Sequence, residues 1–133
     1  MTKRIACLIG LALFATLSAS AQTRRVEVNV PFSFAAAGTN WAAGTYEIDI
    51  RMDNGLATLN SRQSVSRMFL TNAGQSPDNR NMRVRFQRYG NQWVLRAIVG
   101  DGMQADVRPG KLERELMSQK PSDNRTLLAH VER

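Results

Sequence analysis

Cysteine is almost absent from this chain of 133 residues, which contains only Cys7. Cys7 lies inside an apolar run near the N-terminus, so removal of that run would leave no cysteine at all. A single cysteine excludes an intramolecular disulfide, and its position excludes a thiol nucleophile or a Cys-based metal site from the rest of the chain. The hydrophobic core must therefore stabilise the fold unaided.

Histidine is equally scarce, since His130 is the only one and lies near the C-terminus. No serine lies in a nucleophile-elbow sequence, and residues 78–81 lack the spaced acidic ligands of a calcium-binding loop. Glu113 and Glu115 are two apart in an expected helix, so they point in different directions and belong to a solvated surface. The sequence therefore predicts a non-enzymatic protein with no catalytic residue, no metal site and no cofactor.

A hydrophobic run long enough to span a membrane is also missing. Residues 5–17 are apolar, but a span needs about 20 such residues. The run follows Lys3-Arg4 and ends in Ala19-Ser20-Ala21, the arrangement of a cleavable secretory signal. The sequence predicts a signal peptide over residues 1–21 and a single domain over residues 22–133. The domain is expected in the periplasm or outside the cell, with no lipid anchor and no transmembrane segment.

Acidic residues are outnumbered, with 18 Lys and Arg against 11 Asp and Glu and a net charge of +7. After residue 21 the only lysines are Lys111 and Lys120, so the positive charge is carried by arginine. The arginine guanidinium binds planar anions in a forked geometry, which suggests an anionic envelope or extracellular polymer as partner. An ordinary solvated surface is the alternative. Export, and the few aromatic residues among the arginines, argue against nucleic acid as the physiological partner.

Alternation of apolar and polar residues, the pattern of a half-buried strand, recurs along the chain. It predicts strands near residues 26–34, 46–52, 56–62, 65–71, 83–89 and 92–99, separated by loops at 35–43 and 72–81. Pro31 cannot donate a backbone hydrogen bond, so the first strand is expected at an edge or bent there. A short helix is expected at about residues 110–119, and residues 126–132 suggest a closing strand. The prediction is an all-β fold of about seven strands with one short C-terminal helix, a small antiparallel sandwich or partly closed barrel.

Two hairpin turns are predicted, each with a two-residue loop. Asn54-Gly55 would pair Ile50 with Leu59 and place Glu47 opposite Arg62. Gly90-Asn91 would pair Phe86 with Leu95 and place Val84 opposite Ala97.

The second register puts Arg85 directly opposite Arg96, on the face away from the core, with Arg83 on the same side. Like charges in that position repel each other, so a neighbouring acid, splaying into water or a bound anion must relieve them. Arg85, Arg96 and Arg83 are the candidate anion-binding residues. Arg88 is expected to lie over Trp93 as a cation–π pair.

Four motifs occur in order along the chain: Val30-Pro31-Phe32-Ser33-Phe34, Ala43-Gly44-Thr45-Tyr46, residues 86–95 (FQRYGNQWVL) and Glu113-Arg114-Glu115-Leu116. The series resembles a group of small, signal-bearing, exported β-rich proteins of soil bacteria. The likeness covers about residues 26–120. It departs at residues 41–43, where leucine and proline are usual before the glycine, and at Val94, where an aromatic residue is usual. The resemblance implies an exported β-rich domain but does not assign it an activity.

These observations predict an exported, non-enzymatic binding or structural module of the cell envelope or the extracellular space. A hydrolase acting on envelope or extracellular polymers is one alternative, which requires a cleft with convergent ionisable groups. A lipocalin-like carrier is another, which requires a closed barrel around an empty apolar cavity.

Overall fold

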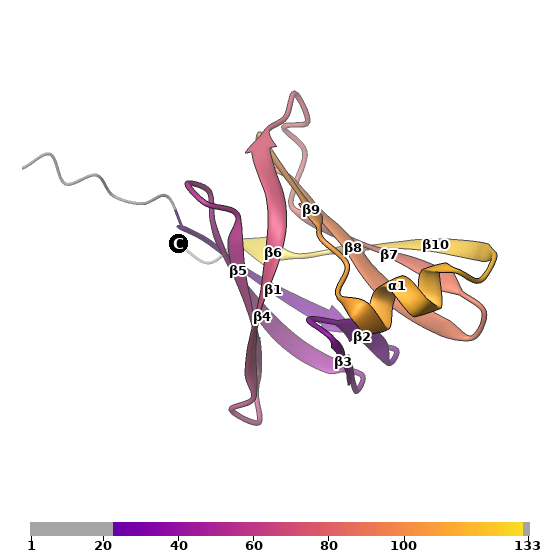
Figure 1. Ribbon diagram of the computed structural model, residues 1–133. Helices are drawn as coiled ribbons and strands as arrows, with labels where there is room; N and C mark the ends of the chain where they lie inside the picture. Colours follow the sequence, from indigo (N-terminus) through magenta and orange to yellow (C-terminus); the bar gives the residue numbers. More distant parts are fainter. Residues whose placement is uncertain (1–22, 132–133) are drawn as a thin grey trace, which may run out of the picture.

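The computed structural model describes residues 23–131 (Figure 1). The predicted signal peptide, residues 1–21, lies outside these residues. Between residues 23 and 131, no helix has the length and apolar character needed to cross a membrane.

The described chain forms eleven strands and one short helix, so the predicted all-β class is confirmed. The helix is α1, Lys111–Met117, which lies inside the predicted range. The strands are β1 Thr23–Val30, β2 Phe34–Ala36, β3 Thr39–Trp41, β4 Gly44–Arg51, β5 Leu56–Ser61, β6 Ser66–Gln75, β7 Arg83–Tyr89, β8 Gln92–Gly100, β9 Met103–Val107, β10 Pro121–Leu128 and β11 His130–Val131.

The predicted number of about seven strands is wrong. The first expected strand is interrupted at Pro31, where the chain bends, and it continues as β2. The expected loop at 35–43 contains the β2–β3 hairpin, which turns at Ala37 and Gly38 with positive φ at both. A further strand, β9, follows a tight turn at residues 100–102. The tail is divided by Ala129 into β10 and β11, and β10 begins earlier than predicted.

Nine of the strands form one path in the order β10-β7-β8-β9-β6-β5-β4-β1-β11. Strands β2 and β3 lie off this path, where they pair with each other and β2 also pairs with β8. The long strand β6 connects two halves of this path, because its first part pairs with β5 and its second part pairs with β9. The C-terminal segment supplies both ends, since β10 pairs with β7 and β11 pairs with β1. These two ends do not pair with each other, so the sheet is not closed. Figure 1 shows β1 and β4 on one side and β7, β8 and β10 on the other.

The core lies between the two halves and is centred on aromatic side chains. The Phe34 ring contacts Tyr46 and Phe86 edge-on, at centroid distances of 5.2 and 5.3 Å, and lies 6.5 Å from Trp41 in a stacked arrangement. Such pairs add to the stabilisation from apolar burial. Around them pack aliphatic residues of both halves, among them Val26, Val28, Ile48, Ile50, Leu59, Val84, Leu95 and Ile98.

The first hairpin has a longer loop than predicted. Ile50 pairs with Ala57 and Ile48 with Leu59, so four residues, 52–55, make the turn. Glu47 consequently lies opposite Asn60, and Arg62 instead approaches Glu27 at 3.6 Å. The register differs from the prediction by two residues. Because strand side chains alternate with a period of two, the same residues still face the core.

The second hairpin follows the predicted register from Tyr89–Gln92 to Phe86–Leu95 and then departs from it at a β-bulge. Beyond the bulge Arg85 pairs with Ala97, and Val84 pairs with Ile98 rather than with Ala97. A bulge inserts one unpaired residue, here Arg96. The side chains that follow it in β8 therefore point to the opposite face of the sheet from the one predicted. Ile98 accordingly lies in the main core, and Ala97 lies on the outer face beside Arg85. The direct Arg85–Arg96 pairing is therefore wrong.

Helix α1 packs on the outer side of the sheet, where Leu112, Leu116 and Met117 cover a small cluster of Ala35, Tyr89 and Val94.

Its Glu113 side chain is only 1% exposed, although the sequence placed it at a solvated surface. The Glu113 Oε1 atom accepts the backbone N–H of Gly38 at 2.7 Å, while Oε2 has no hydrogen-bond partner among the described residues. This contact joins the start of α1 to the β2–β3 turn.

Candidate functional site

Arg83, one of the three predicted anion-binding residues, is engaged within the chain. Its side chain is 15% exposed, forms an ion pair with Asp78 and donates to the carbonyl oxygen of Asn81 at 3.0 Å. Arg80 contacts the same carboxylate at 3.0 Å. Hydrogen bonds from Arg80 and then Arg83 hold the pKa of Asp78 well below its ordinary value of 3.8. Arg83 therefore has an anionic partner already and does not join the other two arginines.

Arg85 and Arg96, the other two predicted residues, line one hollow of about 540 Å³ on the outer face of four neighbouring strands. The bulge in β8 produces this arrangement, because it leaves Arg96 unpaired beside Ala97, the residue opposite Arg85. We name this surface the arginine hollow. Its lining residues are Arg85, Gln87 and Tyr89 of β7, Arg96 and Ala97 of β8, Asp106 of β9, and Asn124 and Thr126 of β10.

The register explains why this surface is hollowed. Thr126, Arg85, Ala97 and Asp106 form one row across β10, β7, β8 and β9, each opposite the next. The short side chain of Ala97 lies between the longer side chains of Arg85 and Asp106. Space therefore remains between Arg85 on one side of the row and Asp106 on the other.

The two guanidinium groups of the arginine hollow have no acidic partner among residues 23–131. The Arg85 side chain is exposed and forms neither an ion pair nor a hydrogen bond with the described residues. The Arg96 Nη1 atom is 3.5 Å from the sulfur of Met117, which is a weak acceptor. Asp106 is not within 4.0 Å of either guanidinium, and it accepts a hydrogen bond from Gln104 at 3.1 Å. The hollow therefore has unused donors for an anion.

The predicted pairing of Arg88 with the Trp93 ring is replaced by other contacts. The Arg88 guanidinium donates to the carbonyl oxygen of Gly90 at 3.0 Å and to Asp123 at 3.4 Å. A cation–π contact occurs instead at Arg125, whose guanidinium carbon is 5.5 Å from the centre of the Phe32 ring.

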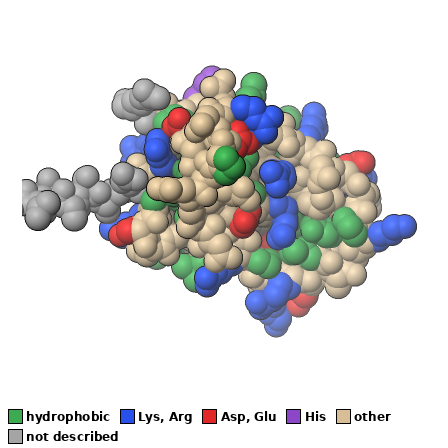
Figure 2. Space-filling view, turned by 90° about the horizontal axis from the view of Figure 1, so that it is seen from above, with side chains coloured by type: hydrophobic (Ala, Val, Ile, Leu, Met, Phe, Trp, Pro, Cys, Tyr) green, Lys and Arg blue, Asp and Glu red, His purple; other side chains and the backbone are tan. Residues whose placement is uncertain are grey.

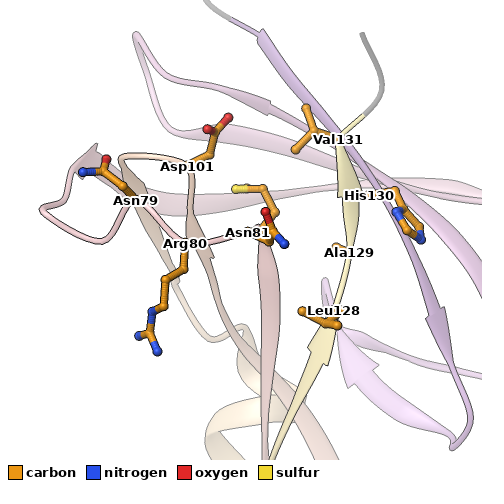
Figure 3. Close-up of a pocket in the computed structure, with 9 residues that line it drawn as sticks. Asn79, Arg80, Asn81, Asp101, Leu128, Ala129, His130 and Val131 are labelled. Atoms are coloured by element: carbon orange, nitrogen blue, oxygen red, sulfur yellow. The ribbon is translucent and has the colours of Figure 1, made fainter.

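A second hollow, of about 310 Å³, lies where the C-terminal segment passes the ends of β7 and β8 (Figure 3). Figure 3 shows the His130 ring directed away from Asp101 and Arg80. Asp101 is engaged with Arg24 at 3.0 Å and Arg80 with Asp78. The geometry does not bring an acid, a base and a nucleophile together here. Nor does any group of three or more metal-ligating side chains occur between residues 23 and 131.

Charge is dispersed over the surface rather than collected on one side. Figure 2 shows Lys and Arg side chains around the whole visible face, several of them beside acidic groups and some beside hydrophobic ones. Most acidic side chains have an arginine partner, as in the Arg25 contacts with Glu47 at 3.0 Å and Asp49 at 2.8 Å. The arginine hollow is distinctive because two arginines without an acidic partner among the described residues line the same hollow.

Five lining residues of the arginine hollow were not identified from the sequence: Gln87, Tyr89, Asp106, Asn124 and Thr126. Gln87 and Tyr89 follow Arg85 at every second residue of β7, so strand alternation alone could have placed them on the same face. Asp106 was missed because β9 was not recognised, although Met103, Ala105 and Val107 do alternate with polar residues. Asn124 was missed because the tail strand was predicted to begin too late, at residue 126. Thr126 lay inside the predicted strand, but its pairing with Arg85 of β7 was not predicted.

No protein-family model matches this chain, and neither does any curated protein or solved structure. The resemblance to small exported proteins of soil bacteria therefore stays a prediction.

Proposed function

We propose that this protein is an exported, non-enzymatic binding module that holds an anionic group of an envelope or extracellular polymer in the arginine hollow. The observation that carries the proposal is the pair Arg85 and Arg96, which share one hollow without an acidic partner among the described residues. Two guanidinium groups at one place repel each other, and an anion bound between them relieves that repulsion.

The surrounding side chains support binding to a polymer at the surface rather than enclosure of a small molecule. The arginine hollow is open and spans four strands, and it carries amide and hydroxyl groups from Gln87, Asn124 and Thr126. A lipocalin-like carrier would need an internal cavity, whereas Phe34, Phe86 and their aliphatic neighbours occupy the space between the two halves. A hydrolase would need convergent acid and base groups, and the diverging side chains around His130 give that alternative less support.

Sulfate should raise the melting temperature of the wild-type protein more than chloride of the same ionic strength does. A ligand at about ten times its Kd adds about 1.4 kcal/mol to the free energy of unfolding, which corresponds to a rise of several degrees for a domain of this size. In Arg85→Gln, one of the two guanidinium groups is gone, so the additional rise in sulfate should largely disappear. Differential scanning calorimetry of both proteins in the two salts measures this difference.

The matched control is Arg67→Gln, since Arg67 is an exposed strand arginine on β6 with no ion pair to the described residues and no place in the arginine hollow. This variant should keep the full wild-type response to sulfate. An equal sulfate response in wild type, Arg85→Gln and Arg67→Gln would contradict the proposed anion site.

Export is tested separately, by intact-mass measurement of the protein made in its native host. The basic Lys3-Arg4 start, the apolar run and the Ala19-Ser20-Ala21 ending predict cleavage after Ala21. The expected product begins at Gln22 and is found outside the cytoplasm. A full-length chain recovered from the cytoplasm would contradict the predicted export.

A further inference from the structure

The arginine hollow has two chemically different ends. Arg85 of β7 borders one end and Asp106 of β9 borders the other, while Arg96 lies on β8 between them. Arg85 is on β7 and Asp106 on β9, with Ala97 of β8 paired between them. Neighbouring strands are about 4.8 Å apart, so the backbones at the two ends are separated by about 10 Å. The arginine hollow, with a volume of about 540 Å³, is large enough for a ligand the size of one sugar ring.

The Asp106 end disfavours a ligand that carries anionic groups along its whole length. A second sulfate or phosphate next to Asp106 would be repelled, because like charges at short range raise the energy of the complex. A carboxylate is an acceptor only, so its favourable partner is a donor such as a hydroxyl group. The Asp106 side chain keeps acceptor capacity for such a donor, since only its Oδ1 atom receives the Gln104 amide, at 3.1 Å.

The remaining polar side chains fit the same kind of ligand. Asn124 and Thr126 lie opposite Gln87 and Arg85, respectively, and their amide and hydroxyl groups both donate and accept hydrogen bonds. A peptide with a free carboxylate is less well matched, because peptide recognition relies on apolar side-chain pockets. In the arginine hollow the apolar surface is limited to Ala97 and the largely buried ring of Tyr89.

We infer that the arginine hollow recognises an acidic sugar residue, with the sugar carboxylate on Arg85 and Arg96 and a ring hydroxyl donating to Asp106. This inference rests on the proposed function and adds the chemical class of the ligand. Asp106 then acts as a specificity residue, because it favours a carboxylate flanked by hydroxyl groups over a dense polyanion.

The test is isothermal titration calorimetry of the full chain with four probes: trigalacturonic acid, its fully methyl-esterified form, inorganic sulfate and triglycine. Wild type should bind trigalacturonic acid, and the ester, which lacks the charge, should bind at least about tenfold more weakly. Arg85→Gln should weaken trigalacturonic acid binding about tenfold, the effect of losing one charged hydrogen bond. Asp106→Asn should weaken trigalacturonic acid binding severalfold but strengthen sulfate binding, and Arg67→Gln should change neither.

The outcomes separate this inference from the proposed function. If Asp106→Asn strengthens trigalacturonic acid and sulfate binding equally, or if the methyl ester binds as well as the acid, the acidic-sugar inference is overturned. Binding of triglycine as tight as that of trigalacturonic acid would overturn it in favour of a peptide carboxylate. If Arg85→Gln alters binding of no anion, the proposed function itself fails. Circular dichroism melts of each variant, all of them at exposed positions, verify that the proteins compared are folded.

Discussion

Gly100→Ala should lower the free energy of unfolding by about 2 to 6 kcal/mol, one of the largest effects expected of any single substitution here. Gly100 ends β8 with a φ of +131°, a conformation that residues with a side chain rarely adopt. A Cβ atom at this position would lie 2.6 Å from the Asn81 carbonyl oxygen and 2.8 Å from the Met82 Cα atom. Both are backbone atoms, so the crowding cannot be relieved by turning a side chain. Urea unfolding of the variant measures the loss.

Two other glycines provide controls for this prediction. Gly38 has a φ of +76° but open space where a Cβ would go, so Gly38→Ala should cost only the conformational strain, about 1 to 2 kcal/mol. Gly74 has neither a positive φ nor a close neighbour, and Gly74→Ala should be neutral or slightly stabilising. If Gly100→Ala lowers the free energy of unfolding no more than Gly38→Ala does, the backbone near Asn81 and Met82 can shift at little energetic cost, and the prediction is contradicted.

Phe34→Ala should cost about 3 to 5 kcal/mol, since it removes the centre of the aromatic core. The Phe34 side chain is 1% exposed and contacts Trp41, Tyr46 and Phe86. Its loss would leave a cavity that residues of several strands would have to fill. The expected result is a lower urea midpoint with an unchanged slope, because the same surface is still exposed on unfolding.

The controls for the core prediction vary size and burial. Phe34→Leu keeps much of the apolar volume and should cost clearly less than Phe34→Ala. Met68 is 65% exposed on β6, so Met68→Ala should change the free energy of unfolding by no more than about 0.5 kcal/mol. Equal losses for Phe34→Ala and Met68→Ala would mean that the aromatic cluster does not anchor the two halves of the sheet.

Much of the strand pattern could be predicted from the sequence, because a half-buried strand alternates by two whatever its neighbours are. The segments that became β4, β5, β7 and β8 were found in this way, and so was the region of α1. In the first hairpin the predicted core-facing residues were correct despite the error in register, because a shift of two residues leaves each side chain on the same face. The predicted signal segment likewise depends only on local composition.

The candidate site was predictable only in part. The sequence identified Arg85 and Arg96 as neighbours on the outer face, and they do share one hollow. The reason given, direct pairing across the hairpin, was wrong, because the bulge at Arg96 places Ala97 opposite Arg85. Arg83 was included because it lies on the same face, but the segment that follows β6 brings Asp78 against it. No local pattern reveals a bulge or an ion pair between separate segments.

The sequence by itself determined the all-β class, most of the core-facing residues, the approximate position of the helix and an arginine-rich outer face. Tertiary structure decided how the four strands β10, β7, β8 and β9 align, and therefore which polar groups surround Arg85. It also decided that Glu113 is buried against Gly38, which lies far from it in sequence. The physical reason is the range of the forces. Alternation and turn conformation depend on residues that are close together in the sequence. Register, bulges and ion pairs depend on interactions between segments that meet only in the folded chain.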